Sequence, residues 1–348
     1  MWSPILKKRA TVDEQIASLH RRGITFHFMD EDAAREFLTN KSYFYKLKSY
    51  WNNYPKIPSG KTVDDYRYED LDFGYLVELS NIDFALSRLV LSLALGVEHA
   101  VKVRTNKLFM ADQDPEIADT CVRRVLHGET PEIHPNPYTD GLVEHCAGEH
   151  AAWHLWELQS FNSQVELYKA YHSVRGTSER YVHMLYIVRK LRNAVSHGSC
   201  LLADVTRLAP TKKREGRSDT QVTNAGLQLC GRNPKKSGKR NSALTQTLDR
   251  LVVNNYAAVL ACHLEFVDSS KVLTYSAASV EDFVKRIEKR REKYFGRENA
   301  PKERNRDVNT TLEALVHLSK GYVTKACEKA NRLEQQRQSM PNGTLPNA

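Results

Sequence analysis

The sequence predicts an all-α, mainly helical fold, and three stretches of helically spaced apolar residues carry this prediction. The longest lies within residues 71–108, where leucine, isoleucine or valine recurs every three or four positions. A second covers residues 181–202, and a third begins at Leu244. Apolar side chains at this spacing form one stripe along a helix, so we expect the three stretches to pack together as a helical bundle.

The N-terminal region adds two shorter helices. Thr11 is expected to cap a helix over residues 11–22, with Glu14 three positions later as its capping-box partner. Asp30 is expected to cap a second helix that runs to about Asn40. These residues therefore form a helical extension ahead of the bundle.

The block at residues 41–54 contains six aromatic side chains and three lysines. Aromatic rings between cations can stack nucleic-acid bases while the cations hold phosphates. Three side chains at helical spacing are expected to pack inward instead: Phe44, Leu47 and Trp51. Three rings are left open between the two roles: Tyr43, Tyr45 and Tyr50.

Positive charge is concentrated in two segments of a chain whose 348 residues carry a net charge of +9. Residues 207–240 contain ten Lys or Arg and two acidic residues, a net charge of +8. Residues 285–306 contain ten Lys or Arg and four acidic residues, a net charge of +6, so the rest of the chain is net −5. This concentration fits contact with phosphates, although a solvated loop and a solvated helix face would explain either segment alone equally well.

Cysteine use and apolar runs restrict the cellular context. The six cysteines include no Cys-x-x-Cys pair, which argues against a zinc ribbon or a disulfide scaffold and suits a reducing cytosol. We find no secretory signal, and the apolar run at residues 85–103 contains charged residues, so we expect a cytoplasmic protein without a membrane span. His150 and His154 have helical ligand spacing but lack the context of a zinc site, so we expect no metal and no cofactor.

The composition divides the chain into five regions. They are an N-terminal helical region at 1–60, a helical core at 68–205 with an insertion at 111–150, a basic linker or loop at 206–242, C-terminal helices at 243–337 that partly complete the bundle, and a disordered tail at 338–348. Pro, Gly, Ser, Lys and Arg set the linker apart from the apolar helices on either side.

The helix at residues 181–202 ends in a polar cluster. Arg192, Asn193 and His197 fall in its last turns, and Gly198 is a suitable helix stop because glycine tolerates the left-handed conformation. Histidine transfers protons near neutral pH, and arginine grips phosphate through two parallel hydrogen bonds. The same cluster can be explained as a helix C-cap, since cations are favoured near a helix C-terminus.

The Arg-x4-His spacing, with Asn directly after the Arg, resembles the ribonuclease motif of HEPN (higher eukaryotes and prokaryotes nucleotide-binding) domains. Further blocks resemble the Abi-like family of bacterial abortive-infection proteins. The matching pieces are Asp13–Ile16, Arg22–Ile24, Asp30–Asp32, Tyr43–Trp51, Trp153–Tyr168 and Arg192–His197. The sequence departs from the family pattern at Phe44-Tyr45-Lys46, Asn162, Ser196 and Gly198. The resemblance covers about residues 10–210 and leaves the C-terminal third unexplained.

The resemblance implies a HEPN-type helical bundle with an N-terminal helical extension and a helical C-terminal region. It also implies a metal-independent endoribonuclease in antiphage defence, with Arg192, His197 and Asn193 as catalytic residues. RNA carries its own nucleophile, the 2′-hydroxyl, so the enzyme has to supply proton transfer and charge stabilisation. The family also has acidic and basic residues at the places of Glu98 and Arg104. We expect a buried or half-buried ion pair that braces the bundle as the role of these two, with phosphate contact by Arg104 as the alternative.

Helix geometry argues that two chains share the site. Residues five apart lie about 140° apart around a helix, so Arg192 and His197 of one chain do not converge. Pairing two such helices about a twofold axis would bring two Arg and two His side chains into one cleft. The resemblance accordingly implies a homodimer.

RNA is the expected partner, including a small non-coding RNA of the kind that the family resemblance implies. The residues expected to contact it are Lys212, Lys213, Arg214, Arg217, Lys235, Lys236, Lys239, Arg240, Tyr45, Lys46 and Arg104. Two other functions stay open: RNA binding without catalysis, and a membrane-surface or protein-interaction module that uses the two basic segments.

Overall fold

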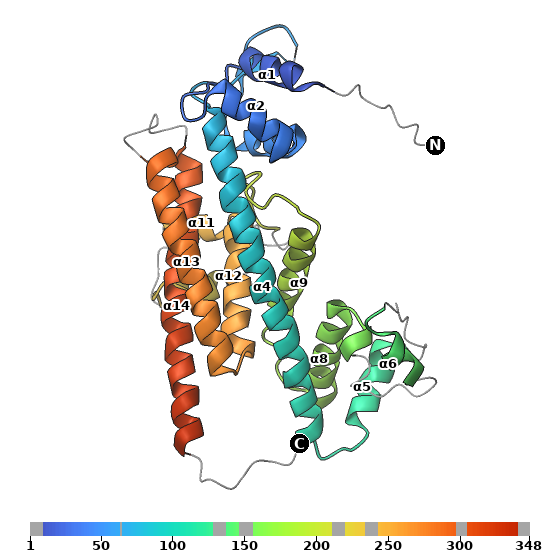
Figure 1. Ribbon diagram of the computed structural model, residues 1–348. Helices are drawn as coiled ribbons and strands as arrows, with labels where there is room; N and C mark the ends of the chain where they lie inside the picture. The colour runs from blue at the N-terminus through green and yellow to red at the C-terminus, as the bar shows by residue number, and fades with distance from the viewer. Residues whose placement is uncertain are drawn as a thin grey trace.

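The computed structural model in Figure 1 describes residues 10–62, 65–127, 137–145, 156–210, 220–233, 243–296 and 305–339. The long elements among these residues are all helices, which confirms the all-α prediction. Within the described part of the chain, the sheet structure is one short antiparallel ribbon, in which β1 (Ile57–Pro58) pairs with β2 (Tyr66–Arg67).

The N-terminal helices lie together at one end of the molecule (Figure 1). They are α1 (Val12–Arg21), α2 (Glu31–Asn40), α3 (Phe44–Ser49) and the short 3₁₀ helix η1 (Tyr50–Asn53). The predicted capping box is present, because the Thr11 hydroxyl accepts from the Glu14 N–H and the Glu14 carboxylate accepts from the Thr11 N–H. Asp30 caps α2 by accepting from the Ala33 N–H at 2.8 Å, also as predicted.

The central element is α4 (Phe73–Ala111), a helix of 39 residues that runs from the N-terminal helices to the opposite end of the molecule (Figure 1). Asp72 fixes its start by accepting from the Gly74 N–H at 2.8 Å. The same carboxylate accepts from the His27 N–H at 2.6 Å. One side chain therefore joins the first turn of α4 to the segment between α1 and α2.

Within the described part of the chain, six further helices complete the bundle around α4. They are α9 (Val182–Ser196), α10 (Thr220–Leu229), α11 (Ala243–Leu248), α12 (Leu251–Phe266), α13 (Ser270–Phe295) and α14 (Arg306–Ser339). Helix α12 packs on α4, α9 and α14, while α13 packs on α4 and runs beside α14 (Figure 1). Buried side chains from all these elements and the N-terminal helices form one continuous hydrophobic core. The C-terminal third therefore belongs to the same bundle as α9.

A smaller core lies at the far end of α4, where α5 (Ile117–Val125) packs on α8 (Phe161–Arg175). The ring of Phe109 from α4 stacks on Trp156 with centroids 6.3 Å apart. Helix α8 also packs against α9. The predicted insertion at residues 111–150 contains α5 and α6 (Asp140–His145), and its other parts include residues outside the described ranges.

The prediction of a linker over residues 206–242 is wrong for its middle. Residues 220–229 form α10 (Thr220–Leu229), which packs on α12 and α14. Val222, Leu227 and Leu229 are buried there. Lys and Arg in the flanking segments outnumber these three apolar residues. Burial of the apolar side chains against two long helices is nevertheless enough to hold a short helix in place.

Helix α4 is long and apolar enough to cross a membrane by length and composition alone. The core helix of a water-soluble bundle passes the same test, so a single helix of this kind is weak evidence for a membrane span. In this fold Leu76, Leu79, Leu86 and Leu93 of α4 are buried among the other helices. This position agrees with the prediction of a buried helix at residues 85–103.

Candidate active site on helix α9

Helix α9 ends in a defined cap, as the sequence predicted. His197 is its C-cap residue, and Gly198 follows with a φ of +71°, the left-handed conformation that glycine adopts without strain. The Gly198 N–H donates to the Val195 carbonyl at 3.1 Å, and the Ser199 N–H donates to the Ala194 carbonyl at 3.0 Å. These two bonds form a Schellman motif, which fixes the direction in which the chain leaves the helix beside His197.

Arg192 is half-buried, with 33% of its side chain exposed, and it reaches α4. Its Nε lies 3.5 Å from Glu98 Oε2. Its Nη1 donates to Asn193 Oδ1 at 3.3 Å. No further partner of this guanidinium lies among the described residues. One edge is therefore paired with Glu98 of α4 by charge alone, since Nε makes no hydrogen bond, while hydrogen-bond donors on the other edge stay free.

His197 and Asn193 are both exposed. The imidazole of His197 has no hydrogen-bond partner within the described part of the chain, and only its backbone N–H is bonded, to the Asn193 carbonyl at 3.1 Å. The Asn193 side chain accepts from Arg192. Among the described residues no hydrogen bond joins the Arg192 guanidinium to the His197 imidazole, which agrees with their spacing on the helix.

Two more α9 side chains, Arg189 and Tyr186, reach α8. The sequence did not identify them as neighbours of the site. Arg189 donates to Asn162 Oδ1, and the Tyr186 hydroxyl donates to Glu166 Oε1. Asn162 stands where the Abi-like pattern has Gly, so this departure was the available signal. The contacts lie one helical turn before Arg192 and Asn193, so the polar surface of the site continues from α9 onto α8.

A buried carboxylate holds the loop that follows α9. Asp83 of α4 accepts from the Tyr50 hydroxyl at 2.7 Å and from the Leu201 N–H at 3.0 Å. Burial raises the pKa of Asp83 to about 6, and these hydrogen bonds oppose the effect of burial only in part. Tyr50 is thus one of the core rings. The hydrogen bond from Leu201 to Asp83 fixes the backbone four residues after His197.

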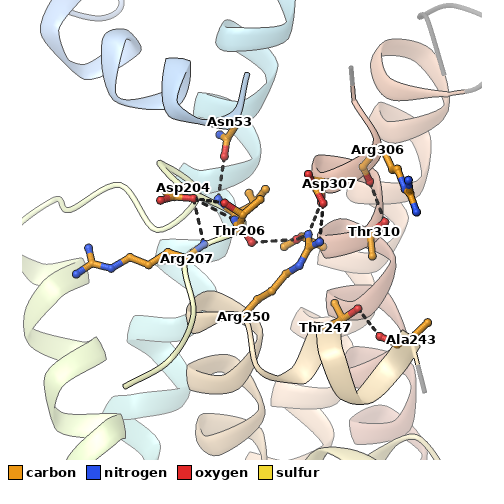
Figure 2. Close-up of polar contacts among 12 residues, drawn as sticks. Asn53, Asp204, Thr206, Arg207, Ala243, Thr247, Arg250, Arg306, Asp307 and Thr310 are labelled. Atoms are coloured by element: carbon orange, nitrogen blue, oxygen red, sulfur yellow. Dashed lines mark hydrogen bonds and ion pairs between the residues drawn. The ribbon is translucent and has the colours of Figure 1, made fainter. Parts of the chain in front are cut away.

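A polar network continues from this loop into the C-terminal helices (Figure 2). The Asn53 side chain accepts from the Val205 N–H at 2.8 Å, and the Val205 carbonyl accepts from the Thr311 hydroxyl at 3.4 Å. Arg250 donates to the Thr311 hydroxyl at 2.8 Å and to the Asp307 carboxylate at 2.6 Å. The N-terminal helices, the loop after α9 and α14 are thereby joined, which gives the loop a fixed position beside the site.

Eight of the eleven residues expected to contact RNA lie outside the described residues: Lys212, Lys213, Arg214, Arg217, Lys235, Lys236, Lys239 and Arg240. Tyr45 on α3 is 80% exposed, so its ring is free for contact, and Tyr43 is exposed as well. Lys46 is half-buried and close enough to Asp83 to lower the pKa of that carboxyl, although burial outweighs it. Phe44, Leu47 and Trp51 pack inward, as predicted.

Arg104 has a fully engaged guanidinium. Its Nη1 donates to Glu265 Oε1 at 3.0 Å, its Nη2 donates to the Glu265 carbonyl at 2.5 Å, and Nη2 lies 3.5 Å from Asp268 Oδ2. The guanidinium carbon also lies 4.6 Å from the centre of the Phe266 ring. Glu98 and Arg104 therefore do not form one ion pair: each takes part in a bracing ion pair with a separate partner, Arg192 for Glu98 and Glu265 for Arg104. Phosphate contact by Arg104 stays a prediction, and this geometry does not favour it.

The described residues contain no group of three or more His, Cys, Asp or Glu side chains placed to hold a metal ion. Of the clustered residues in the insertion, His145 ends α6, whereas Cys146, His150 and His154 lie outside the described ranges.

Fold and site together define an all-α bundle protein with an Arg–Asn pair and a histidine at the capped end of one core helix. Residues 36–203 match the family model described as Abi-like protein, and this match supports the Abi-like family for the chain. It also supports a role in abortive-infection defence, and the matched segment includes α4, α8 and α9. No curated protein and no solved structure matches the chain.

Proposed function

We propose that this protein is a HEPN-type, metal-independent endoribonuclease that cuts RNA during abortive infection. The 2′-hydroxyl of the RNA attacks the adjacent phosphorus, and the 5′-oxygen of the next nucleotide leaves with a proton, so one product ends in a 2′,3′-cyclic phosphate. His197 transfers protons in this reaction, and Arg192 binds the phosphate and stabilises its developing charge. Asn193 orients Arg192 or a phosphate oxygen.

The state of the Arg192 guanidinium is the observation that carries this proposal. Glu98 anchors one edge, while the other edge has only the neighbouring Asn193 among the described residues. A cation that is held in place but keeps free donors is suited to grip a phosphate with two parallel hydrogen bonds. The exposed imidazole of His197 follows at the end of the same helix, where it is open to proton exchange.

The proposal includes a homodimer that assembles the site. Phe84 and Leu95 of α4 are exposed and Leu91 is half-buried. They share one face of the helix, because intervals of seven and eleven residues are close to two and three turns. Glu98, the partner of Arg192, continues this face. A second copy docked on such an apolar stripe about a twofold axis would bring two Arg192 and two His197 side chains into one cleft.

Further RNA contacts belong to the same proposal. Tyr45 offers an exposed ring for base stacking, and Lys46 and the basic residues between 207 and 240 offer cations for the phosphates. A small non-coding RNA is the proposed form of a bound partner in the resting protein.

Cleavage of labelled RNA by the purified protein in the presence of EDTA tests the function. We expect cleavage that leaves cyclic phosphate ends, and a loss of about 100-fold or more in Arg192→Ala and in His197→Ala. RNA affinity should fall far less than activity, since most contacts remain. A ribonuclease activity that EDTA removes, or that both variants retain, would contradict the proposal.

A second candidate function is RNA binding without catalysis. It is favoured by the lack of a hydrogen bond between Arg192 and His197 among the described residues of one chain, which leaves a single chain without an assembled site. In this case Arg192→Ala would weaken RNA binding and make it less dependent on salt concentration, and neither the wild type nor any variant would shorten the RNA.

A further inference from the structure

We propose that a hollow between α5 and α8 is a nucleotide subsite, which holds one unpaired nucleotide of single-stranded RNA next to the Arg192–His197 site. This inference rests on the proposed function, because it specifies where the RNA lies on either side of the reacting phosphate. It concerns a surface that neither the family resemblance nor the Arg-x4-His motif assigns.

The hollow has the size and lining of a nucleotide site. Its volume is about 440 Å³, within the usual range for small-ligand pockets. Seven polar side chains line it: Arg124, His127, Asn162, Ser163, Glu166, Lys169 and Ser173. Its remaining lining includes Val125, Leu126 and Ala170, which offer an apolar wall for the face of a base.

The charges in the hollow favour an anion. Arg124 is exposed and has no ion-pair partner among the described residues. Glu166 is the one carboxylate in the described lining, and it is already engaged by Lys169 Nζ at 3.6 Å and by the Tyr186 hydroxyl. Arg124 is therefore left to meet a phosphate, while the amide and hydroxyl groups of the lining can hydrogen-bond the edge of a base.

The wall of the hollow is tied directly to α9. Asn162 and Glu166 are four residues apart on α8, and they accept from Arg189 and Tyr186 of α9. Arg189 in turn precedes Asn193 by four positions, and side chains at that interval are roughly 5–6 Å apart on a helix. A strand leaving the hollow thus meets Arg189 first and the Arg192–Asn193 pair one turn later.

This order of contacts sets the chemical class of the occupant. A base held between Arg124 and α8 has to be unstacked from its neighbours, so the occupant is single-stranded, and the phosphates that follow lie along Arg189 and Arg192. A duplex would keep its bases stacked and could not enter a hollow of this volume.

Equilibrium binding of a fluorescent single-stranded RNA to the full-length His197→Ala protein tests the subsite. In that background we expect Arg124→Ala to weaken binding about fivefold or more. The matched control is Arg123→Ala, which removes the same charge from the neighbouring exposed residue outside the described lining of the hollow, and we expect less than about a twofold change. Ser173→Trp fills the hollow without altering charge and should weaken binding as much as Arg124→Ala.

The possible outcomes separate this inference from the proposed function. If Arg124→Ala and Ser173→Trp bind RNA as tightly as their parent, or if Arg123→Ala weakens binding equally, the subsite is wrong and the nuclease proposal is unaffected. If the wild-type protein and His197→Ala cut RNA equally, the nuclease proposal is wrong, while a selective effect of Arg124→Ala still supports the subsite. Absence of RNA binding by the wild-type protein would overturn both.

Discussion

Arg104 and Arg192 both join α4 to a neighbouring helix through an ion pair, yet their guanidinium groups are in different states. Arg104 is 24% exposed at its side chain, and it contacts two carboxylates, a carbonyl and the Phe266 ring. Arg192 is held by Glu98 at one edge only. The first arrangement uses the whole fork to stabilise the fold, whereas the second leaves donors for a ligand.

The number of contacts made by each guanidinium separates an arginine that braces the bundle from one that is available for chemistry. Arg104 and Arg192 both match the Abi-like pattern. In the sequence each is an arginine in a stretch expected to form a core helix. What distinguishes them is the number of acceptors that the folded chain already supplies.

Exchange of the two arginines for alanine should affect activity and stability in opposite proportions. Arg192→Ala should reduce RNA cleavage by about 100-fold or more, because it removes the group proposed to stabilise charge on the phosphate. Arg104→Ala should leave the activity of the folded fraction within about twofold. Cleavage rates normalised to folded protein, measured by circular dichroism on the same samples, would test this. Equal loss in both variants would remove the distinction.

Stability should show the reverse order. Arg104→Ala removes two ion pairs, the hydrogen bond to the Glu265 carbonyl and the packing on Phe266, and should lower the free energy of unfolding by about 2–4 kcal/mol. Arg192→Ala removes one ion pair, to a Glu98 side chain that is 14% exposed, and should cost about 1–2 kcal/mol. Urea titrations at one pH give both numbers. A larger loss for Arg192→Ala than for Arg104→Ala would mean that Arg192 is the structural residue.

The pH dependence of stability tests the role of Asp83, which holds the loop after α9, separately from the catalytic residues. The pKa of Asp83 is raised from 3.8 to about 6 in the folded protein, so the native state binds its proton more tightly than the unfolded chain. Its contribution to stability is complete below pH 4 and is lost as pH rises through 6, by at most roughly 3 kcal/mol for a shift of two units.

Unfolding of the wild-type protein and of Asp83→Asn at pH 4.5 and pH 7.5 measures this contribution. The stability of the wild type relative to the variant should be greater at the lower pH, since the variant has no proton to lose at this position. Parallel pH dependence of the two proteins would show that Asp83 does not titrate in this range.

The smallest expected effect concerns the anchor of Arg192. Glu98→Gln removes the charge that holds one edge of the guanidinium, so its free edge should become less well oriented for phosphate. We expect cleavage to fall about three- to tenfold with little change in stability. Glu265→Gln is the matched control beside Arg104, and it should lower stability without lowering activity per folded molecule.

Local signals made much of the fold predictable. Thr11 with Glu14, Asp30, and Gly198 each act on the backbone within a few residues, so their helix ends could be located from the sequence. Helix α10 was missed because its three buried apolar residues sit between strongly basic segments, and its burial depends on α12 and α14, which are distant in the sequence.

The site was predictable only where one helix carries it. Arg192, Asn193 and His197 are close in sequence, and their relative directions follow from helix geometry. The pairing of Arg192 with Glu98, and of Arg189 with Asn162, depends on which helices pack side by side, which no local pattern specifies. The hollow between α5 and α8 was unforeseen for the same reason.

A mixed dimer of two inactive variants tests most directly whether two chains share the site. Arg192→Ala and His197→Ala carry different tags, are co-expressed, and the species bearing both tags is isolated and assayed for RNA cleavage. Our account predicts that this mixed dimer recovers much of the lost activity, because the arginine of one subunit and the histidine of the other meet at one phosphate. A mixed dimer as inactive as its parents, beside an active wild-type protein prepared in the same way, would contradict it.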